Sequence, residues 1–210
     1  MYKRQYLQGA SRKLSERARY YLAGQVLSAP FYQSLRTEQQ MGYFVLCGAM
    51  DIMQLPGLVF VVQSPNQTPD IIEAAIIEFL QGYEASLDMM TDADFEQHRS
   101  SLVSDVMRQE EKLRDRSGRY WLEIDRKDYE FDSRERLSEE INEVSLEDFR
   151  QFFQTSVLDP AGPRLVVRSF GEVKGAEAAL PRNEIADPLA FRSSQSLFLS
   201  MRSSDLFIGR

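Results

Sequence analysis

The hydrophobic residues near the start of the chain recur at helical spacing. Steps of three and four residues place one set of side chains on a single helical face: Leu14, Ala18, Tyr21, Leu22, Val26 and Ala29. Pro30 lacks the amide hydrogen that a helix interior requires, so we expect it to interrupt this helix. Phe31 and Leu35 continue the stripe and predict a second short helical piece that ends in the polar stretch 36–40.

Two short runs rich in aromatic and β-branched residues follow, at 43–50 and 58–63, separated by a loop that contains Pro56 and Gly57. This pattern predicts an antiparallel hairpin. The second run is apolar at every position, which is typical of a strand covered on both faces. We therefore expect it to lie centrally in its sheet.

The remaining pattern predicts four more helices. Thr68 followed by Pro69 starts one, and Thr91 with Asp94 starts the next. Three-residue spacings that resemble capping boxes open two short helices, at Asp132 with Glu135 and at Ser145 with Asp148. The third helix of the chain should bury the residues Phe95, Leu102, Val106 and Leu113.

Residues 164–170 alternate enough to form a further strand, and beyond Gly171 a polar tail contains isolated Phe191, Phe198 and Phe207. The order of helix, two strands, four helices and strand predicts an α+β fold, in which helices cover one face of a largely antiparallel sheet. We expect one α+β domain over 1–171 and a C-terminal tail over 172–210 that packs on the domain or extends it. Residues 6–8 would be the end of a strand whose beginning is missing.

Composition and charge narrow the functional classes. The 210 residues are 43% hydrophobic and 27% charged, as expected of a folded chain. The formal net charge of -7 opposes binding to nucleic acid or to an acidic lipid surface through phosphate neutralisation. No apolar run approaches the ~18 residues of a membrane span.

Most residues that could act in catalysis or binding are more simply interpreted as structural residues. Cys47, the one cysteine, lies in a predicted strand and is expected to be a small buried hydrophobe. His98, the one histidine, is expected to be a partly buried structural residue rather than a ligand. With one residue of each type, the chain cannot assemble a His/Cys zinc site. We interpret two charged groups as solvated helical faces: Arg108, Lys112, Arg114, Arg116 and Arg119, and Glu135, Glu139, Glu140, Glu143 and Glu147.

One polar connection has two interpretations. Residues 35–43 lead out of a helix, through Gly42, into a strand, and loops in such positions often carry function. Alternatively, the segment is a helix C-terminus in which Arg36 interacts with the negative end of the helix dipole, and Gly42 adopts a positive φ before Tyr43 starts the strand. Composition alone does not separate these interpretations.

A family resemblance favours the functional interpretation. Residues 29–43 resemble the helix-to-strand segment in the fourth, C-terminal domain of the pitrilysin/insulin-degrading enzyme family of zinc peptidases, which reads L-R-T-x-E-Q-L-G-Y. Met41 replaces the usual leucine, a change that conserves volume. Further matching segments occur in the same order along the chain: 57–64, 95–98, 120–121 and 129–132.

The resemblance implies one part of a clamshell of four homologous domains, of which only the first carries the zinc motif H-x-x-E-H. Nothing here matches those ligands, so zinc would be bound outside this chain and no catalytic or metal-binding residue is assigned to it. The arginine and tyrosine of the family pattern contact the substrate backbone, and they correspond to Arg36 and Tyr43. A guanidinium and a phenol can donate hydrogen bonds to a peptide carbonyl.

The resemblance therefore implies the non-zinc, substrate-binding C-terminal portion of a zinc metalloendopeptidase that degrades peptides and small unfolded proteins. Its partners would be a peptide substrate and a zinc-bearing N-terminal half, in the same chain or a companion chain. The alternative is a catalytically inactive, stand-alone peptide-binding or scaffold subunit. The family domain begins with strands, so we expect an N-terminally truncated chain with residues 1–5 foreign to the domain. A bacterial relative would be periplasmic, and any other cytoplasmic.

Overall fold

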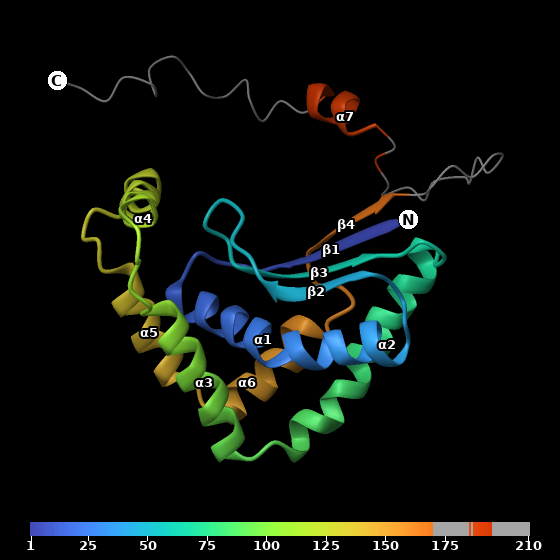
Figure 1. Ribbon diagram of the computed structural model, residues 1–210, viewed down its shortest axis with the longest axis horizontal. Coiled ribbons are helices and arrows are strands. Elements are labelled where there is room, and N and C mark those ends of the chain that lie inside the picture. The colour runs from blue at the N-terminus through green and yellow to red at the C-terminus, as the bar shows by residue number, and fades with distance from the viewer. Residues whose placement is uncertain (170–184, 186, 195–210) are drawn as a thin grey trace. The chain divides into compact units, whose positions relative to one another are not determined.

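The computed structural model describes residues 1–169, 185 and 187–194 (Figure 1). The chain divides into two units, Met1–Gly171 and Glu172–Arg210. In the second unit the structure describes helix α7 (Pro188–Ser194), which contains Phe191. The tail residues Phe198 and Phe207 lie outside the described residues, and the assignment of 172–210 as a tail stays a prediction.

A four-stranded antiparallel sheet forms the first layer of Met1–Gly171, in the order β2-β3-β1-β4. The strands are β1 (Tyr2–Gln8), β2 (Phe44–Ala49), β3 (Gly57–Gln63) and β4 (Arg164–Ser169). The predicted hairpin is confirmed: β2 pairs with β3, with Val45 opposite Val62. The central position of β3 is also confirmed, because its other neighbour is β1.

The expectation for the first residues is wrong. Strand β1 runs over Tyr2–Gln8 rather than 6–8 and pairs with both β3 and β4. The side chains of Lys3 and Gln5 are buried, so these residues are an integral part of the sheet. The sequence pattern missed the start of β1 because a buried lysine and a buried glutamine interrupt its apolar signal.

Helices form the second layer and cover one face of the sheet, which confirms the predicted α+β class (Figure 1). They are α1 (Leu14–Tyr32), α2 (Pro69–Met89), α3 (Asp92–Val106), α5 (Ser133–Glu143) and α6 (Leu146–Phe152). Two π-helical turns extend α1 and α6: η1 (Gln33–Glu38) and η2 (Phe153–Val157). Helix α4 (Leu113–Asp125) stands apart from this layer, beyond the tip of the β2–β3 hairpin (Figure 1).

The core lies between the sheet and the helices. Phe31 of α1 is fully buried and contacts the rings of Phe60 and Phe79, which joins the helix to β3 and α2. A smaller apolar cluster on the opposite face of the sheet contains Tyr6, Val59 and Val61. Strand β3 is thus covered on both faces, as its unbroken apolar run predicts.

Two predicted helix boundaries are wrong. Pro30 does not interrupt α1, because burial of Phe31 and Leu35 on the continuing face outweighs the hydrogen bond that proline removes. Leu113 is not on the buried face of α3, which ends at Val106; it begins α4 and is 80% exposed. Phe95 and Leu102 are buried, as predicted.

The helix caps follow the sequence with one exception. Thr68 caps α2, and complete capping boxes at Thr91 and Ser145 start α3 and α6. The capping box expected at Asp132 is wrong, because this carboxylate accepts a hydrogen bond from the Arg136 guanidinium at 2.7 Å instead of capping the helix. Among the described residues, no helix combines the length and apolarity that crossing a membrane requires.

Candidate functional site

The connection between α1 and β2 is held by its own backbone. After the π-helical turn η1, the amide of Gln39 donates to the carbonyl of Ser34 at 2.9 Å, and the amide of Met41 donates to that of Leu35 at 2.8 Å. Gln40 takes a positive φ of 51°, the left-handed conformation that ends many helices. The sequence interpretation placed this conformation at Gly42, and the structure places it two residues earlier.

The structure brings Arg36 and Tyr43 to the two ends of one short turn. An Arg36 guanidinium nitrogen, Nη1, donates to the carbonyl oxygen of Gly42 at 3.0 Å, directly before Tyr43. The amide of Tyr43 donates to the carbonyl of Gln63 at 3.0 Å, so this residue is fixed to β3. Its side chain is 58% exposed. The turn therefore holds an exposed phenol next to a guanidinium that uses one of its nitrogens on the turn itself.

Gly42 is required by close packing rather than by its φ angle. A Cβ atom at this position would lie 2.2 Å from the carbonyl oxygen of Gln63 and 2.9 Å from its carbonyl carbon. Carbon and oxygen atoms do not approach this closely without bonding, so any other residue would push the turn away from β3. Glycine thus sets the position of both Arg36 and Tyr43.

A groove next to this turn was not predicted from the sequence. It lies between α1 and the edge strand β2, has a volume of about 670 Å³, and is lined by Gln25, Ser28, Ala29, Tyr32, Gln33, Val45, Leu46 and Cys47. Tyr32 is 50% exposed and precedes Arg36 by one helical turn. The four-residue spacing of Tyr32 and Arg36, which places both on one helical face, is the signal in the sequence that points to Tyr32.

Helix α1 lies against β2 at Gly24, next to Gln25 of this groove. A Cβ atom on Gly24 would lie 2.5 Å from the amide nitrogen of Ala49. The helix therefore covers the end of the strand edge at Ala49, and the groove opens beside Val45 and Cys47. Cys47 is buried, and burial raises the pKa of its thiol, which confirms that it is a buried structural residue.

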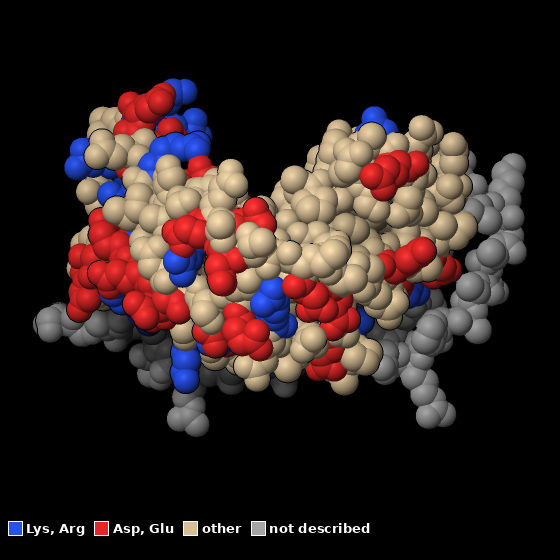
Figure 2. Space-filling view, turned by 90° about the horizontal axis from the view of Figure 1, so that it is seen from below, with Lys and Arg blue, Asp and Glu red and all other residues tan. Residues whose placement is uncertain are grey.

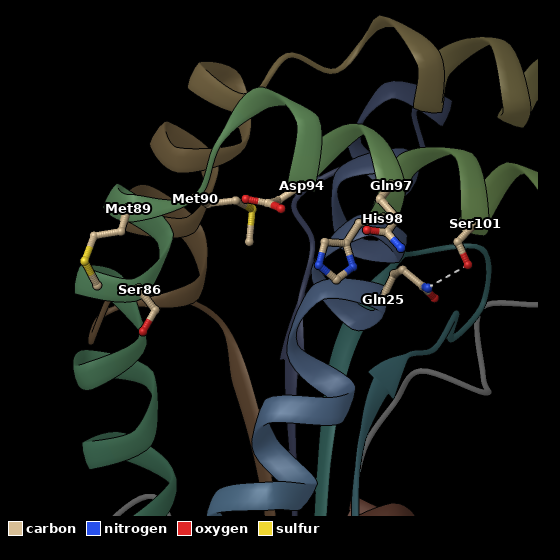
Figure 3. A pocket seen from close by; sticks show the side chains of 8 residues that line it. All are labelled: Gln25, Ser86, Met89, Met90, Asp94, Gln97, His98 and Ser101. Carbon is tan, nitrogen blue, oxygen red and sulfur yellow. Dashed lines mark hydrogen bonds between the residues drawn. The ribbon is translucent and has the colours of Figure 1, made fainter.

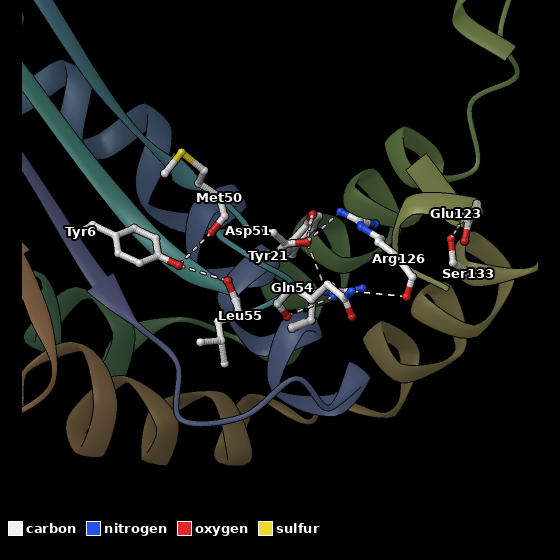
Figure 4. A network of polar contacts seen from close by, with 10 residues as sticks. Tyr6, Tyr21, Met50, Asp51, Gln54, Leu55, Glu123, Arg126 and Ser133 are labelled. Atoms are coloured by element: carbon white, nitrogen blue, oxygen red, sulfur yellow. Dashed lines mark hydrogen bonds and ion pairs between the residues drawn. The ribbon is translucent and has the colours of Figure 1, made fainter. Parts of the chain in front are cut away.

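A buried polar network anchors the other end of the hairpin (Figure 4). Asp51 follows β2, and its Oδ2 atom lies 3.3 Å from Nε of Arg17 and 3.4 Å from Nη2 of Arg126. Gln54 at the hairpin tip donates from Nε2 to the carbonyl of Arg126 at 3.3 Å. These contacts tie the hairpin to α1 and to the residue after α4, so β2 is held at both ends.

A second pocket surrounds His98, between the end of α2, α1 and α3 (Figure 3). Its volume is about 630 Å³. Gln25 donates to the hydroxyl of Ser101 at 3.3 Å, and the hydrogen bonds from the hydroxyl and amide of Thr91 lower the pKa of Asp94. The Asp94 carboxylate is therefore engaged in the capping box that Thr91 starts. His98 is partly buried here, as predicted, and its role remains a structural interpretation.

The charged groups read as helical faces are mostly paired or exposed. Arg119 pairs with Glu110 at 2.9 Å and stacks over the ring of Tyr120 at 4.4 Å. The acidic run on α5 and α6 is largely exposed, as predicted, and more acidic than basic side chains are visible on the face shown in Figure 2. Among the described residues, no three His, Cys, Asp or Glu side chains gather closely enough to hold a metal ion.

Sequence comparisons relate the chain to zinc proteases. The family described as PQQ synthase PqqF-like, C-terminal lobe domain 4, matches residues 22–121. The chain is 26% identical to a nardilysin-like protein of Arabidopsis thaliana over 84% of its length and 27% identical to protease 3 of Escherichia coli K12 over 73%. It spans only 18% and 16% of those proteins.

Comparisons of structure agree on the fold. Pitrilysin matches with a TM-score of 0.76 and 24% identity, covering 86% of this chain and 20% of pitrilysin. A peptidase M16 inactive domain from Pseudomonas fluorescens matches with a TM-score of 0.57 and 11% identity, covering 79% of this chain and 39% of that one. These structures share the fold of this chain, and the family match and the relatives in sequence confirm the resemblance inferred from the sequence.

Proposed function

Because this chain is homologous to the inactive C-terminal domains of pitrilysin-type zinc proteases, we propose that it is the portion of such an enzyme that binds the peptide substrate. The observation that carries the proposal is the turn from Arg36 to Tyr43. It places two hydrogen-bond donors beside an open groove, at the positions that the family pattern assigns to substrate contact.

The two side chains fit recognition of a peptide backbone. The Tyr43 phenol is exposed and makes no hydrogen bond within the described residues, so it is available to a substrate carbonyl. Arg36 uses one nitrogen on the Gly42 carbonyl, which orients the guanidinium and leaves its other N–H groups for the peptide. Both donors are independent of the substrate side chains, as expected for a site that accepts many sequences.

In this proposal the zinc ion is held by another part of the enzyme. The described residues of this chain do not offer a fitting ligand set, and no step assigned to them passes through a metal. The bound zinc would supply the hydrolytic chemistry in the complete protease. This chain would bind and orient the peptide while that chemistry proceeds.

Peptide binding tests the proposal directly. We expect a fluorescent extended peptide to bind the chain, as measured by anisotropy, and Tyr43→Phe to weaken binding about threefold to tenfold, the value of one hydrogen bond. Tyr129→Phe is the matched control, because Tyr129 is similarly exposed at 63% and lies outside the groove. Equal dissociation constants for the two variants would refute the role of Tyr43.

Arg36 requires a variant that keeps its charge. Arg36→Lys retains a positive side chain but loses the planar set of donors, so we expect weaker peptide binding and a loss of stability of at most about 1 kcal/mol, the value of the hydrogen bond to Gly42. Arg12→Ala, at an exposed position outside the groove, controls for general charge effects. If Arg36→Lys binds the peptide as tightly as the unmodified chain, Arg36 is only a structural residue of the turn.

A further inference from the structure

Strand β4 forms the edge of the sheet opposite β2 (Figure 1). Its residues alternate in the direction of their backbone groups, and the hydrogen bond from the Gln8 amide to the Pro163 carbonyl, at 2.9 Å, fixes the phase of this alternation. Leu165 and Val167 therefore direct their amides and carbonyls toward β1. Val166 directs both groups away from the sheet, and neither has a hydrogen-bond partner among the described residues.

The two arginines on either side of Val166 do not protect this edge. Charged side chains on an edge strand normally oppose pairing with another chain. The Arg164 guanidinium is held in the preceding turn, where its Nη2 atom donates to the carbonyl of Asp159 at 2.6 Å. The Arg168 guanidinium pairs with α2, where its Nη2 atom lies 2.7 Å from the Glu73 carboxylate. Both charges thus have partners in their own chain, and the backbone of Val166 is left unguarded between them.

Strand β4 also exposes apolar side chains on the face of the sheet that the helices do not cover. Leu165 lies opposite Tyr6, which belongs to the small apolar cluster on that face. Leu165 is 56% exposed and Val167 is 45% exposed, whereas Val166 lies on the helical face and is half-buried. An edge strand that combines free backbone groups with exposed apolar side chains pairs readily with another strand.

We propose that β4 pairs with β4 of a second copy of this chain, antiparallel, about a two-fold axis at Val166. In this register Val166 lies opposite its own copy, and the two residues exchange amide-to-carbonyl hydrogen bonds. Leu165 of each copy lies opposite Val167 of the other, in the pairs whose side chains approach most closely. The same surface of both copies makes the contact, as two-fold symmetry requires. This association is independent of peptide binding and goes beyond the proposed function.

The apolar side chains favour this register over its neighbours. An axis at Leu165 would place Val167 opposite Pro163, and an axis at Val167 would place Leu165 opposite Ser169. Either shift leaves one exposed apolar side chain without an apolar partner, whereas the axis at Val166 pairs both. The register is therefore specified by the sequence of β4 itself.

Sedimentation velocity of the complete chain tests the association. The contact is small, so we expect a reversible dimer with a dissociation constant on the order of 100 μM. Salt should tighten it, because two copies with a net charge of -7 repel each other. Val167→Lys should weaken it about tenfold, since a charge then lies in each apolar pair. Leu46→Lys makes the same change on β2, at the other edge, where Leu46 is 41% exposed, and should leave the association unchanged. A chain that stays monomeric up to about 1 mM, or equal effects of the two variants, would overturn the proposal.

Engineered cysteines test the register. Val166→Cys places two thiols opposite each other on the axis, where the Cα atoms of a hydrogen-bonded pair lie about 5.5 Å apart, within the range that a disulfide bridges. Val167→Cys is the matched control, because its copy is displaced by two residues along the strand, beyond the reach of a disulfide. Cys47 is buried and does not compete.

Oxidation by dissolved oxygen with a copper catalyst should cross-link Val166→Cys about tenfold faster than Val167→Cys. Random collisions would give the opposite order, because position 167 is the more exposed of the two. Cross-linking of Val167→Cys at an equal or higher rate, as measured by non-reducing electrophoresis, would overturn the proposal.

Discussion

Substitution of Gly42 by alanine tests whether one close backbone contact sets the position of the turn proposed to bind peptide. The added Cβ atom would lie 2.2 Å from the Gln63 carbonyl oxygen. An unbonded carbon and oxygen separate to about 3.3 Å, so the turn and β3 must move apart by about 1 Å. This shift lengthens the 3.0 Å hydrogen bond from the Tyr43 amide to Gln63 and disturbs the contact of Arg36 with residue 42.

The expected cost follows from these two hydrogen bonds. Each contributes about 1 kcal/mol to the free energy of unfolding, so their weakening costs up to about 2 kcal/mol, and distortion of the strand start adds to it. Alanine also lowers the conformational entropy of the unfolded chain, which stabilises the folded state by about 0.5 kcal/mol. We therefore expect Gly42→Ala to lower the free energy of unfolding by about 2 kcal/mol and the melting temperature by about 4–8 °C.

Urea unfolding followed by circular dichroism measures this difference, and Gly48→Ala is the matched control. Gly48 lies in β2, the strand that follows this turn, but a Cβ atom there would meet no other atom within 4 Å. We expect Gly48→Ala to be neutral or slightly stabilising. If Gly42→Ala is as stable as Gly48→Ala, the turn adapts freely, and Gly42 does not position Arg36 and Tyr43.

Three further predictions concern the support of the fold. Burial alone would raise the pKa of Glu73, but the hydrogen bonds and charges of Lys3 and Arg168 outweigh burial and leave this pKa below 4.5. The Glu73 carboxylate therefore contributes fully to stability above about pH 4.5, and this contribution is lost in more acidic solution. Glu73→Gln leaves the fully buried Lys3 without its carboxylate and should cost about 3 kcal/mol near pH 6. This difference should shrink toward about pH 3 in urea titrations, and a difference independent of pH would contradict the reasoning. Ser145→Ala removes a helix cap and should cost about 1 kcal/mol by the same assay, whereas Ser145→Thr should be nearly neutral. Phe31→Ala should cost about 3–5 kcal/mol, because the ring is fully buried between two others, and a loss below about 1 kcal/mol would show that the core refills the space.

Local pattern was enough for the elements whose signals are short-range. The apolar run of β3 predicted burial on both faces, and the caps at Thr91 and Ser145 marked the starts of two helices. These signals depend on neighbours within a few residues, so the sequence contains them in full. The failures came where distant contacts override local preference, as at Pro30 in α1.

Strand β1 shows more clearly that distant contacts cannot be predicted from local pattern. Lys3 is fully buried, which its charge alone does not predict, because the carboxylate that compensates it belongs to Glu73, seventy residues along the chain. The pairing of β1 with both β3 and β4 is equally long-range. Prediction from the alternation of polar and apolar residues therefore gave a strand that is shorter than β1.

The sequence by itself determined the class of the fold, the family resemblance and the choice of Arg36 and Tyr43 as candidate residues. Tertiary structure alone decided what surrounds them. The groove exists because α1 meets β2 at Gly24 and separates from it toward Ser28, and the free edge exists because β2 is the outer strand of the sheet. Both features depend on where elements distant in sequence come to lie, and packing of the whole domain fixes that arrangement.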